Sequence, residues 1–205
     1  MSRIWYTSDL HFSHKRVAED RGFGEDTEAH DAIICENWIK NVRAKDQIYV
    51  LGDISIGGHK NEHHALDLIS KLPGMKKIIF GNHDSPSPIH SKPEKYFKDY
   101  MDVFEFGAGY VCKKINGQTV ELSHYPFSRD HTDNPRYVNH RRPDYGQWLI
   151  HGHIHDHNLR KDGRQIHIGL DSWEHSPVSQ EQVVEYMEDP YDFAMFVDGI
   201  EYRSI

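Results

Sequence analysis

The feature that most constrains this chain is a series of short apolar runs, each followed at once by side chains that can bind a metal. Residues 3–8, 47–51 and 76–80 are rich in β-branched and aromatic residues, which is typical of buried strands. The polar residues that follow them are Asp9-Leu10-His11, Gly52-Asp53 and Gly81-Asn82-His83-Asp84. Because open α/β sheets bind ligands at the carboxyl ends of their strands, the pattern predicts a site at one sheet edge.

Two amphipathic segments connect these strands. A helix is predicted from Asp26 or Thr27 to about Arg43, and a second over residues 61–71, with Ala65, Leu68, Ile69 and Leu72 facing inward. Strand, helix and strand of these lengths indicate parallel βαβ units with right-handed crossovers. Residues 16–25 are polar and are expected to cross the surface as a loop.

The alternation of an extended chain is expected to place Asp9 and His11 on one face, with Leu10 pointing into the core. Further along, strands are expected over residues 103–106, 110–115, 118–123, 148–150 and 165–169. They deliver His124 and the segment His151-Gly152-His153-Ile154-His155. A short helix around residues 183–187 and a hairpin over 193–202 complete the chain.

Composition narrows the class of protein. The chain has 205 residues and no linker-like stretch, so residues 1–205 are predicted to form a single domain. No apolar run approaches the roughly 18 residues of a membrane span, and the N-terminus does not resemble a signal peptide. The formal net charge of -8 disfavours a broad basic face for duplex nucleic acid. Cys35 and Cys112 are expected to be reduced core thiols, and a cytoplasmic location follows as the default.

The candidate ligands indicate a particular metal chemistry. Asp, His and Asn donors suit two divalent ions, with Mn²⁺ the first choice and Fe, Zn²⁺, Mg²⁺ or Ni²⁺ the others. Each residue alone is more often structural, but the ordered set contains too many donors for one tetrahedral ion. Two ions that share a carboxylate can activate a hydroxide, which attacks phosphorus in line.

These motifs carry a family resemblance. Asp9-x-His11, Gly52-Asp53, Gly81-Asn82-His83-Asp84, His124 and Gly152-His153-x-His155 are similar, in order and spacing, to the motifs of the calcineurin-like metallophosphoesterases. The resemblance covers about residues 1–180. The opening from Trp5 to Phe12 also resembles a compact bacterial and bacteriophage branch of that family.

The resemblance implies a fold and a set of roles. The fold would be an α/β (α+β) β-sandwich flanked by helices. The first ion would be held by Asp9, His11 and His155, and the second by Asn82, His124 and His153, with Asp53 bridging the two. His83 would contact the phosphate and protonate the leaving oxygen, and Asp84 would orient its ring.

The leading hypothesis is a dinuclear metal-dependent phosphoesterase that hydrolyses small phosphodiesters, with 2′,3′-cyclic nucleotides as one candidate, or phosphomonoesters. The alternatives are a nuclease acting on DNA or RNA ends and a non-catalytic scaffold that keeps the fold. The expected partner is a small phosphate ester, which could be a nucleotide, rather than a nucleic acid or a membrane.

The basic loop over residues 127–146 could bind the rest of a substrate or be a solvated surface segment. Asp156 is a candidate partner for a ligand histidine, and Asp171 and Trp173 could line the cleft. Native metal, ester class and oligomeric state stay open.

Overall fold

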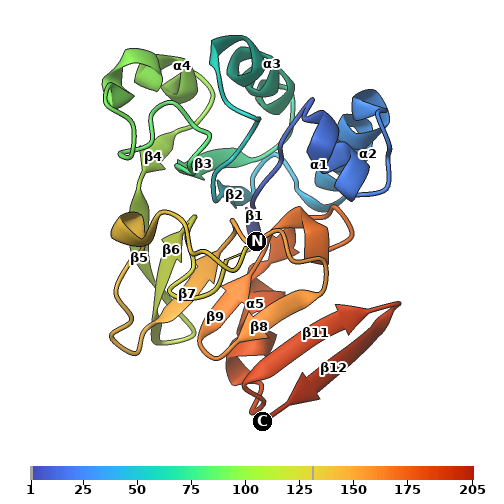
Figure 1. The fold of residues 1–205 in the computed structure, drawn as a ribbon, viewed down its shortest axis with the longest axis vertical. Coiled ribbons are helices and arrows are strands. Elements are labelled where there is room, and N and C mark those ends of the chain that lie inside the picture. The colour runs from blue at the N-terminus through green and yellow to red at the C-terminus, as the bar shows by residue number, and fades with distance from the viewer. Residues whose placement is uncertain (1, 131) are drawn as a thin grey trace.

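The protein folds into two β-sheets that pack face to face, with helices on the outside (Figure 1). We describe a computed structural model that covers residues 2–130 and 132–205. The first sheet has five strands in the order β10-β1-β2-β3-β4, in which β1 to β4 run parallel and β10 runs antiparallel to β1. Its strands are β1 (Ile4–Thr7), β2 (Gln47–Val50), β3 (Met75–Ile79), β4 (Phe106–Ala108) and β10 (Val178–Ser179).

The second sheet has seven strands in the order β12-β11-β8-β9-β7-β6-β5. Strands β6, β7 and β9 are parallel neighbours, whereas β5, β8, β11 and β12 pair antiparallel. The strands are β5 (Tyr110–Ile115), β6 (Gln118–Ser123), β7 (Trp148–His151), β8 (Leu159–Asp162), β9 (Gln165–His167), β11 (Phe193–Val197) and β12 (Ile200–Ser204).

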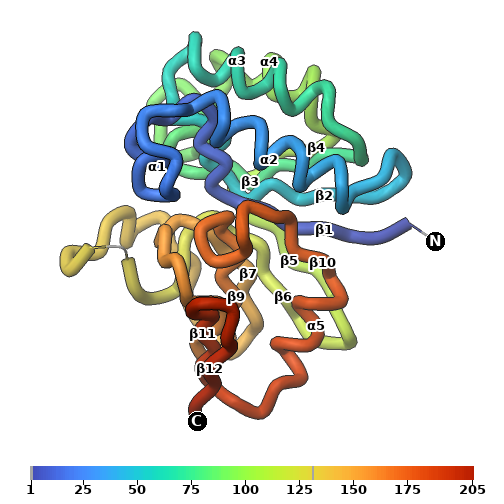
Figure 2. The backbone as a smooth tube through the Cα atoms, turned by 90° about the vertical axis from the view of Figure 1, so that its right-hand side faces the viewer, coloured from blue at the N-terminus to red at the C-terminus, as the bar shows by residue number. Residues whose placement is uncertain are grey.

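Helices α1 to α4 lie on the side of the first sheet that faces away from the second sheet (Figure 2). The helices are α1 (Lys15–Asp20), α2 (Thr27–Asn41), α3 (His59–Ser70), α4 (Phe97–Met101) and α5 (Gln180–Glu188). Asp26 caps α2 by accepting a hydrogen bond from Ala29 N–H, and Ser179 caps α5 in a capping box with Gln182. Among the described residues, no helix is long and apolar enough to cross a membrane.

The first sheet has a hydrophobic core on each side. On the helix side, Trp38 from α2 and Ile69 from α3 pack against Ile48 and Ile78 of the strands. Between the two sheets, Ile79 packs in a cluster with Leu122, Ile150 and Ile166. Strands β1, β2 and β3 are therefore packed on both faces. This packing holds the strand ends in place.

The predicted α/β fold with two sheets flanked by helices is confirmed, and so is the parallel pairing of the first three strands. The loop prediction for residues 16–25 is wrong over 16–20, where helix α1 forms and buries Val17 and Ala18, and residues 21–25 lie outside helices and strands. The strand predicted at 103–106 lies instead at Phe106–Ala108, after α4. Strands β8 and β10 were not predicted, because both are short and carry polar residues. In α3 it is Leu66 that is buried, and Leu68 is only partly buried.

Both cysteines are free thiols, but only one fits its predicted place. Cys35 is partly buried against the helix-side core. Cys112 is exposed, so its placement in the core was wrong. The strand that carries it, β5, is the edge strand of the second sheet, and every second residue there faces solvent.

We expect Trp38→Ala to lower the free energy of unfolding by about 3–5 kcal/mol, because it empties a fully buried site. It also removes the indole N–H that donates to the Pro73 carbonyl over 2.8 Å. Urea unfolding of the unmodified protein and of Trp38→Ala in the same buffer measures this change. The control is Ile39→Ala on the same helix, where the side chain is 59% exposed and a change within about 0.5 kcal/mol is expected. Equal effects would contradict the assignment of Trp38 to the core.

Candidate metal centre

The predicted ligands come together where strands of both sheets end. Asp9 follows β1, Asp53 follows β2 and Asn82 follows β3, all in the parallel part of the first sheet. His124 follows β6, and His153 and His155 follow β7, its parallel neighbour in the second sheet. A bridge between Ser8 and Gly169 joins the two sheets beside this edge.

One group of ligand atoms surrounds the space between Asp9 and His11. Asp9, His11 and His155 each offer a donor atom, and these atoms lie within 4.8 Å of one another. His155 Nε2 is 3.7 Å from Asp9 Oδ1 and 3.2 Å from His11 Nε2. Asp9 Oδ1 is buried and receives no hydrogen bond from residues 2–130 or 132–205. An unpaired buried carboxylate oxygen is costly, so this donor set fits a cation.

A second group lies on the other side of Asp53. His124 Nε2 is 3.4 Å from Asp53 Oδ2 and 3.2 Å from Asn82 Oδ1. His153 Nδ1 is 3.2 Å from the same His124 nitrogen. Asp53 Oδ2 also lies 3.8 Å from His11 Nε2, so this one oxygen faces both groups.

Hydrogen bonds behind two of the histidines define which nitrogen faces the centre. His124 Nδ1 lies 2.7 Å from the Leu51 carbonyl, which can only accept, so Nδ1–H is the donor. His155 Nδ1 lies 3.3 Å from a carboxylate oxygen of Asp171. In each neutral ring the lone pair is then on Nε2, directed at the other ligands. Donation of the second ring N–H to a fixed acceptor is the usual arrangement of metal-binding histidines.

Burial and neighbouring charged groups shift the pKa values of the side chains in the centre. Burial alone would lower the pKa of His124, but Asp53 raises it to about 10. Burial would raise the pKa of Asp53, and His124 beside it lowers it well below the usual range. Burial and the neighbouring His155 lower the pKa of His11 well below its usual value, which favours the neutral ring. A buried site with two carboxylates and several imidazoles, whose protons a bound metal would displace, suits divalent cations.

The backbone around the ligands is unusual. The expected extended conformation of Asp9 and His11 is wrong, because both residues are in the left-handed region, at φ 57° and 46°. Asp53, His153 and His155 are left-handed too. Such conformations are uncommon outside glycine, although Asn, Asp and His adopt them more readily than other residues. Tight turns, and not strand alternation, therefore direct these side chains to a common point.

Two glycines allow the ligand loops to approach each other. A Cβ on Gly81 would lie 2.2 Å from Asp53 Oδ1, and a Cβ on Gly152 would lie 2.3 Å from Asp9 Oδ2. These contacts are too short for any side chain, which explains why Gly stands before Asn82 and His153. The Gly-Asn-His and Gly-His motifs thus serve packing as well as ligation.

His83 borders the centre from the loop after β3. Its backbone N–H donates to Asp53 Oδ1 over 2.8 Å, and its ring centroid is 5.4 Å from that of His11. The role predicted for Asp84, orienting the His83 ring, does not match its contacts. Its buried carboxylate accepts from the N–H groups of Gly81, Asp53 and Ile54. Asp84 therefore fixes the backbone of Asp53, and burial with the Asp53 charge raises the pKa of Asp84 to about 7.

A buried ion pair that the sequence did not predict supports the first ligand group. Arg21, from the segment expected to be a surface loop, donates to both carboxylate oxygens of Asp171 at 3.0 and 3.1 Å. Asp171 in turn accepts from His155, and Arg21 also donates to the Asp9 carbonyl over 2.8 Å. The Arg21 side chain is fully buried. Arg21 lies ten residues after His11, and no local pattern in the sequence indicated this role.

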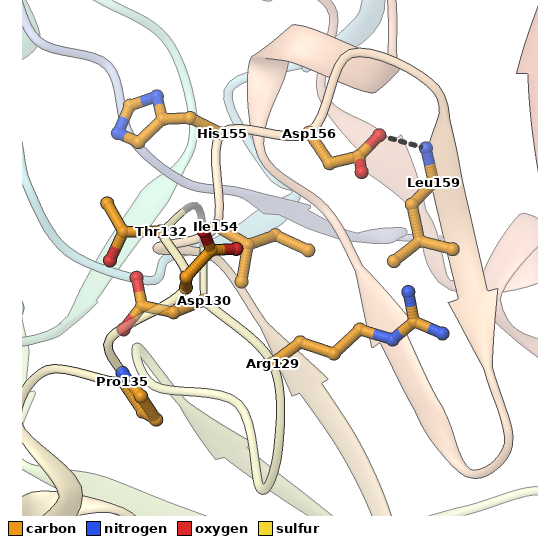
Figure 3. A pocket seen from close by; sticks show the side chains of 9 residues that line it. Arg129, Asp130, Thr132, Pro135, Ile154, His155, Asp156 and Leu159 are labelled. Atoms are coloured by element: carbon orange, nitrogen blue, oxygen red, sulfur yellow. Dashed lines mark hydrogen bonds between the residues drawn. The ribbon is translucent and has the colours of Figure 1, made fainter.

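Asp156, the partner suggested for a ligand histidine, has a different function. Its carboxylate turns away from the His155 ring and accepts from the N–H groups of Asn158 and Leu159 (Figure 3). It stabilises the turn that leads into β8. Asp171 occupies the orienting position instead, and Trp173, the other cleft candidate, is buried in the core between the sheets.

Two adjoining cavities open at the centre. One of about 440 Å³ is lined by His11, His14, Asp53, Asn82, His83 and His155, together with Thr132 and Arg136 of the 127–146 segment. The other, of about 460 Å³, shares His155 and Thr132 with it and extends between Arg129, Asp130 and Pro135 on one side and Asp156 and Leu159 on the other (Figure 3). The 127–146 segment therefore borders the site. Its four arginines all lie near carboxylates: Arg129 pairs with Asp162, Arg141 with Asp130 and Arg142 with Glu121, and Arg136 lies 3.9 Å from Asp130.

Four further histidines, which are not among the predicted ligands, lie in different places. His14 lines the cavity of about 440 Å³, and its Nδ1 is 3.3 Å from His11 Nδ1. His151 is buried behind the ligands and donates to the Gly152 carbonyl. His59 is exposed on α3, and His157 lies in the turn before β8.

The fold and this centre define an α/β protein with a cluster of Asp, His and Asn ligands between two sheets. No family model matches the chain. The gene 66 protein of Mycobacterium phage L5 is 41% identical over 183 residues, covering 84% of this chain and 88% of that protein. The gene 66 protein of Mycobacterium phage D29 is 38% identical over 198 residues, covering 92% and 98%. The chain therefore belongs to the family of these mycobacteriophage gene 66 proteins.

Among solved structures, the protein of unknown function AQ665 from Aquifex aeolicus is similar, with a TM-score of 0.66 and 22% identity. The match covers 91% of this chain and all of that chain, so the two share a fold. An archaeal phosphodiesterase aligns more loosely, with a TM-score of 0.41 and 15% identity over 98% of this chain.

We expect Asp171→Asn to weaken Mn²⁺ binding by about 10- to 100-fold, because it removes the charged partner that orients His155. Equilibrium dialysis followed by elemental analysis measures the affinity. Asp156→Asn is the matched control, since an amide oxygen can still accept the two turn hydrogen bonds. A larger loss for Asp156→Asn than for Asp171→Asn would reverse the assignment of the orienting carboxylate.

Proposed function

We propose that the protein is a metal-dependent phosphoesterase that hydrolyses small phosphodiesters or phosphomonoesters at this centre. The observation that carries the proposal is the position of Asp53. One of its oxygens faces both ligand groups, and the other accepts from the backbone of His83. A shared carboxylate between two sets of Asp, His and Asn donors is the arrangement that two-metal hydrolysis of phosphate esters requires.

In this proposal Asp9, His11 and His155 would hold one divalent ion, Asn82, His124 and His153 would hold the other, and Asp53 would be shared between the two groups. Two such ions would polarise a phosphoryl oxygen and lower the pKa of a bound water. Mn²⁺ is our first choice, because the donor set combines carboxylate, amide oxygen and imidazole and contains no thiolate. The unpaired Oδ1 of Asp9 supports an ion on its side of Asp53.

The chain supplies the remaining chemistry. His83 lines the same cavity as the ligands and is held beside Asp53 by its own backbone N–H, so it can pass a proton to the leaving oxygen. Arg136 borders the cavity and lies 3.9 Å from Asp130, so it can attract an anionic ester in competition with that carboxylate. The cavity volume, about 440 Å³, suits a substrate of nucleotide size or smaller.

The small-ester proposal is favoured over a nuclease because of where the positive charge lies. Arg129, Arg141 and Arg142 of the basic segment are paired with Asp162, Asp130 and Glu121. With the formal charge of -8, this leaves little basic surface for a nucleic-acid backbone. A 2′,3′-cyclic nucleotide is a substrate within the size limit, and it is the first nucleotide to test.

The first test is hydrolysis of bis-p-nitrophenyl phosphate and p-nitrophenyl phosphate, in Mn²⁺ and after chelation. We expect turnover in Mn²⁺, loss of turnover with chelator and recovery when Mn²⁺ is restored. The reason is that the ions would polarise the phosphoryl group and activate the attacking water. The ratio of the two rates assigns diester or monoester preference. Metal-loaded protein that turns over neither ester would refute the proposal and favour a scaffold.

We expect His83→Ala to keep its bound metal but to lower turnover by about 10²- to 10⁴-fold on alkyl esters, which need a proton on the leaving oxygen. The loss should be smaller on p-nitrophenyl esters, because an acidic phenol departs without a proton. Asp53→Ala is the comparison, since it removes the shared ligand and should lose both metal and activity. Elemental analysis and paired kinetics separate the two. If His83→Ala also loses metal, His83 is a ligand and its proposed role is wrong.

A further inference from the structure

A second cluster of metal-binding side chains lies away from this centre, on the surface formed by α3 and α4. His59 and His63 belong to α3, and Asp99 belongs to α4. Each offers one donor atom, and these atoms lie within 4.8 Å of one another. All three are absent from the residues that line the cavity of the predicted centre.

The geometry of the cluster matches what a transition metal needs. Residues four apart on a helix share a face, and the rings of His59 and His63 have centroids 4.1 Å apart. His63 Nε2 lies 3.3 Å from Asp99 Oδ2. In a tetrahedral zinc site with bonds of about 2.0–2.1 Å, neighbouring donor atoms are separated by about 3.3 Å. The His–Asp spacing is therefore already that of two ligands on one ion.

Neighbouring side chains limit the freedom of these ligands. The Tyr96 ring packs against His59, with centroids 4.9 Å apart. Glu62 precedes His63 on α3 and accepts a hydrogen bond from the Tyr100 hydroxyl over 2.7 Å, and Tyr100 follows Asp99 on α4. This buried contact holds the two helices at the separation that brings His63 to Asp99.

We propose that His59, His63 and Asp99 bind one divalent transition-metal ion, with Zn²⁺ as the representative, at a site distinct from the dinuclear centre. Two imidazoles and one carboxylate are a donor set that prefers Zn²⁺, Ni²⁺ or Cu²⁺ to Mg²⁺ or Ca²⁺. Three protein ligands leave one position for solvent, which the partial exposure of the cluster permits.

The ion would link α3 to α4, and this gives the site a structural consequence. Tyr100 on α4 also lies 3.4 Å from Asp84 Oδ1, and Asp84 fixes the backbone of Asp53. An ion at the surface cluster would therefore stabilise the helix pair that supports the loop after β2. We expect bound Zn²⁺ to raise the melting temperature through this cluster as well as through the centre.

The test is the number of Zn²⁺ ions bound per full-length chain, measured by equilibrium dialysis and elemental analysis. We expect His63→Ala and Asp99→Asn each to bind one ion fewer than the unmodified protein, through a loss of affinity of at least about tenfold at that site. His64→Ala is the matched control, because His64 is an exposed neighbour on the same helix outside the cluster. It should bind as many ions as the unmodified protein.

Two further comparisons make the result decisive. The Asp53→Ala variant should still bind Zn²⁺ at the surface cluster. Adding Asp99→Asn to that variant should remove this ion, which separates the surface site from the dinuclear centre. Asp99→Asn preserves size, so it carries the test if His63→Ala does not fold. Equal Zn²⁺ content in the unmodified protein, His63→Ala and Asp99→Asn would overturn the proposal, as would an equal loss in His64→Ala. The readout is independent of catalysis, so it stands apart from the phosphoesterase proposal.

Discussion

The structure of the centre depends on a backbone that turns sharply at its ligands. Left-handed conformations occur at Asp9, His11, Asp53, His153 and His155. Each such residue costs about 1–3 kcal/mol, and the conformation persists only where the surroundings fix it. The glycines that precede Asn82 and His153 add a second constraint, because the loops approach too closely for any Cβ. The sheets bring the strand ends to one edge, but these turns are what aim the donor atoms at one another.

Two buried polar networks maintain that conformation, and both begin outside the ligand set. Asp84 gathers N–H groups from the loops after β2 and β3, and it lies beside Tyr100 of α4, which bonds Glu62 of α3. Arg21, just past the end of α1, holds the Asp9 carbonyl and the Asp171 carboxylate behind His155. Removing one partner of the Arg21–Asp171 ion pair would leave the other as an uncompensated buried charge, which costs about 3–5 kcal/mol. Helices that contain no ligand are therefore part of the centre's support.

The sequence predicted the features that repeat along the chain and missed those that depend on contacts across it. Apolar runs followed by Asp, Asn or His located the strand ends, and the parallel pairing of β1, β2 and β3 follows from the helices between them. Helix α1 was missed, because a six-residue helix with only Val17 and Ala18 buried has too few apolar positions to show a period. The pairing of Arg21 with Asp171 spans 150 residues, and no local pattern encodes it. Likewise, the sequence does not show whether Asp84 orients the His83 ring or binds the backbone. The structure decides this, because the Asp84 carboxylate accepts from three backbone N–H groups.

The charge balance of the centre links metal binding to folding. Two buried carboxylates, Asp9 and Asp53, need positive charge nearby, and a proton on His124 can balance only one of them, since it faces Asp53 most closely. Burial and His155 lower the pKa of His11 well below the usual range, so His11 is a poor source of the second charge. His155 lies 3.7 Å from Asp9 Oδ1, and although burial opposes it, Asp171 and Asp9 raise its pKa, so a proton there can balance Asp9 only until a metal takes its lone pair. Divalent cations between the two ligand groups would balance both carboxylates and would use the lone pairs that His124 and His155 direct inward. Since the unfolded chain lacks this arrangement, the free energy of metal binding would add to the stability of the fold and offset part of the strain at the ligand turns.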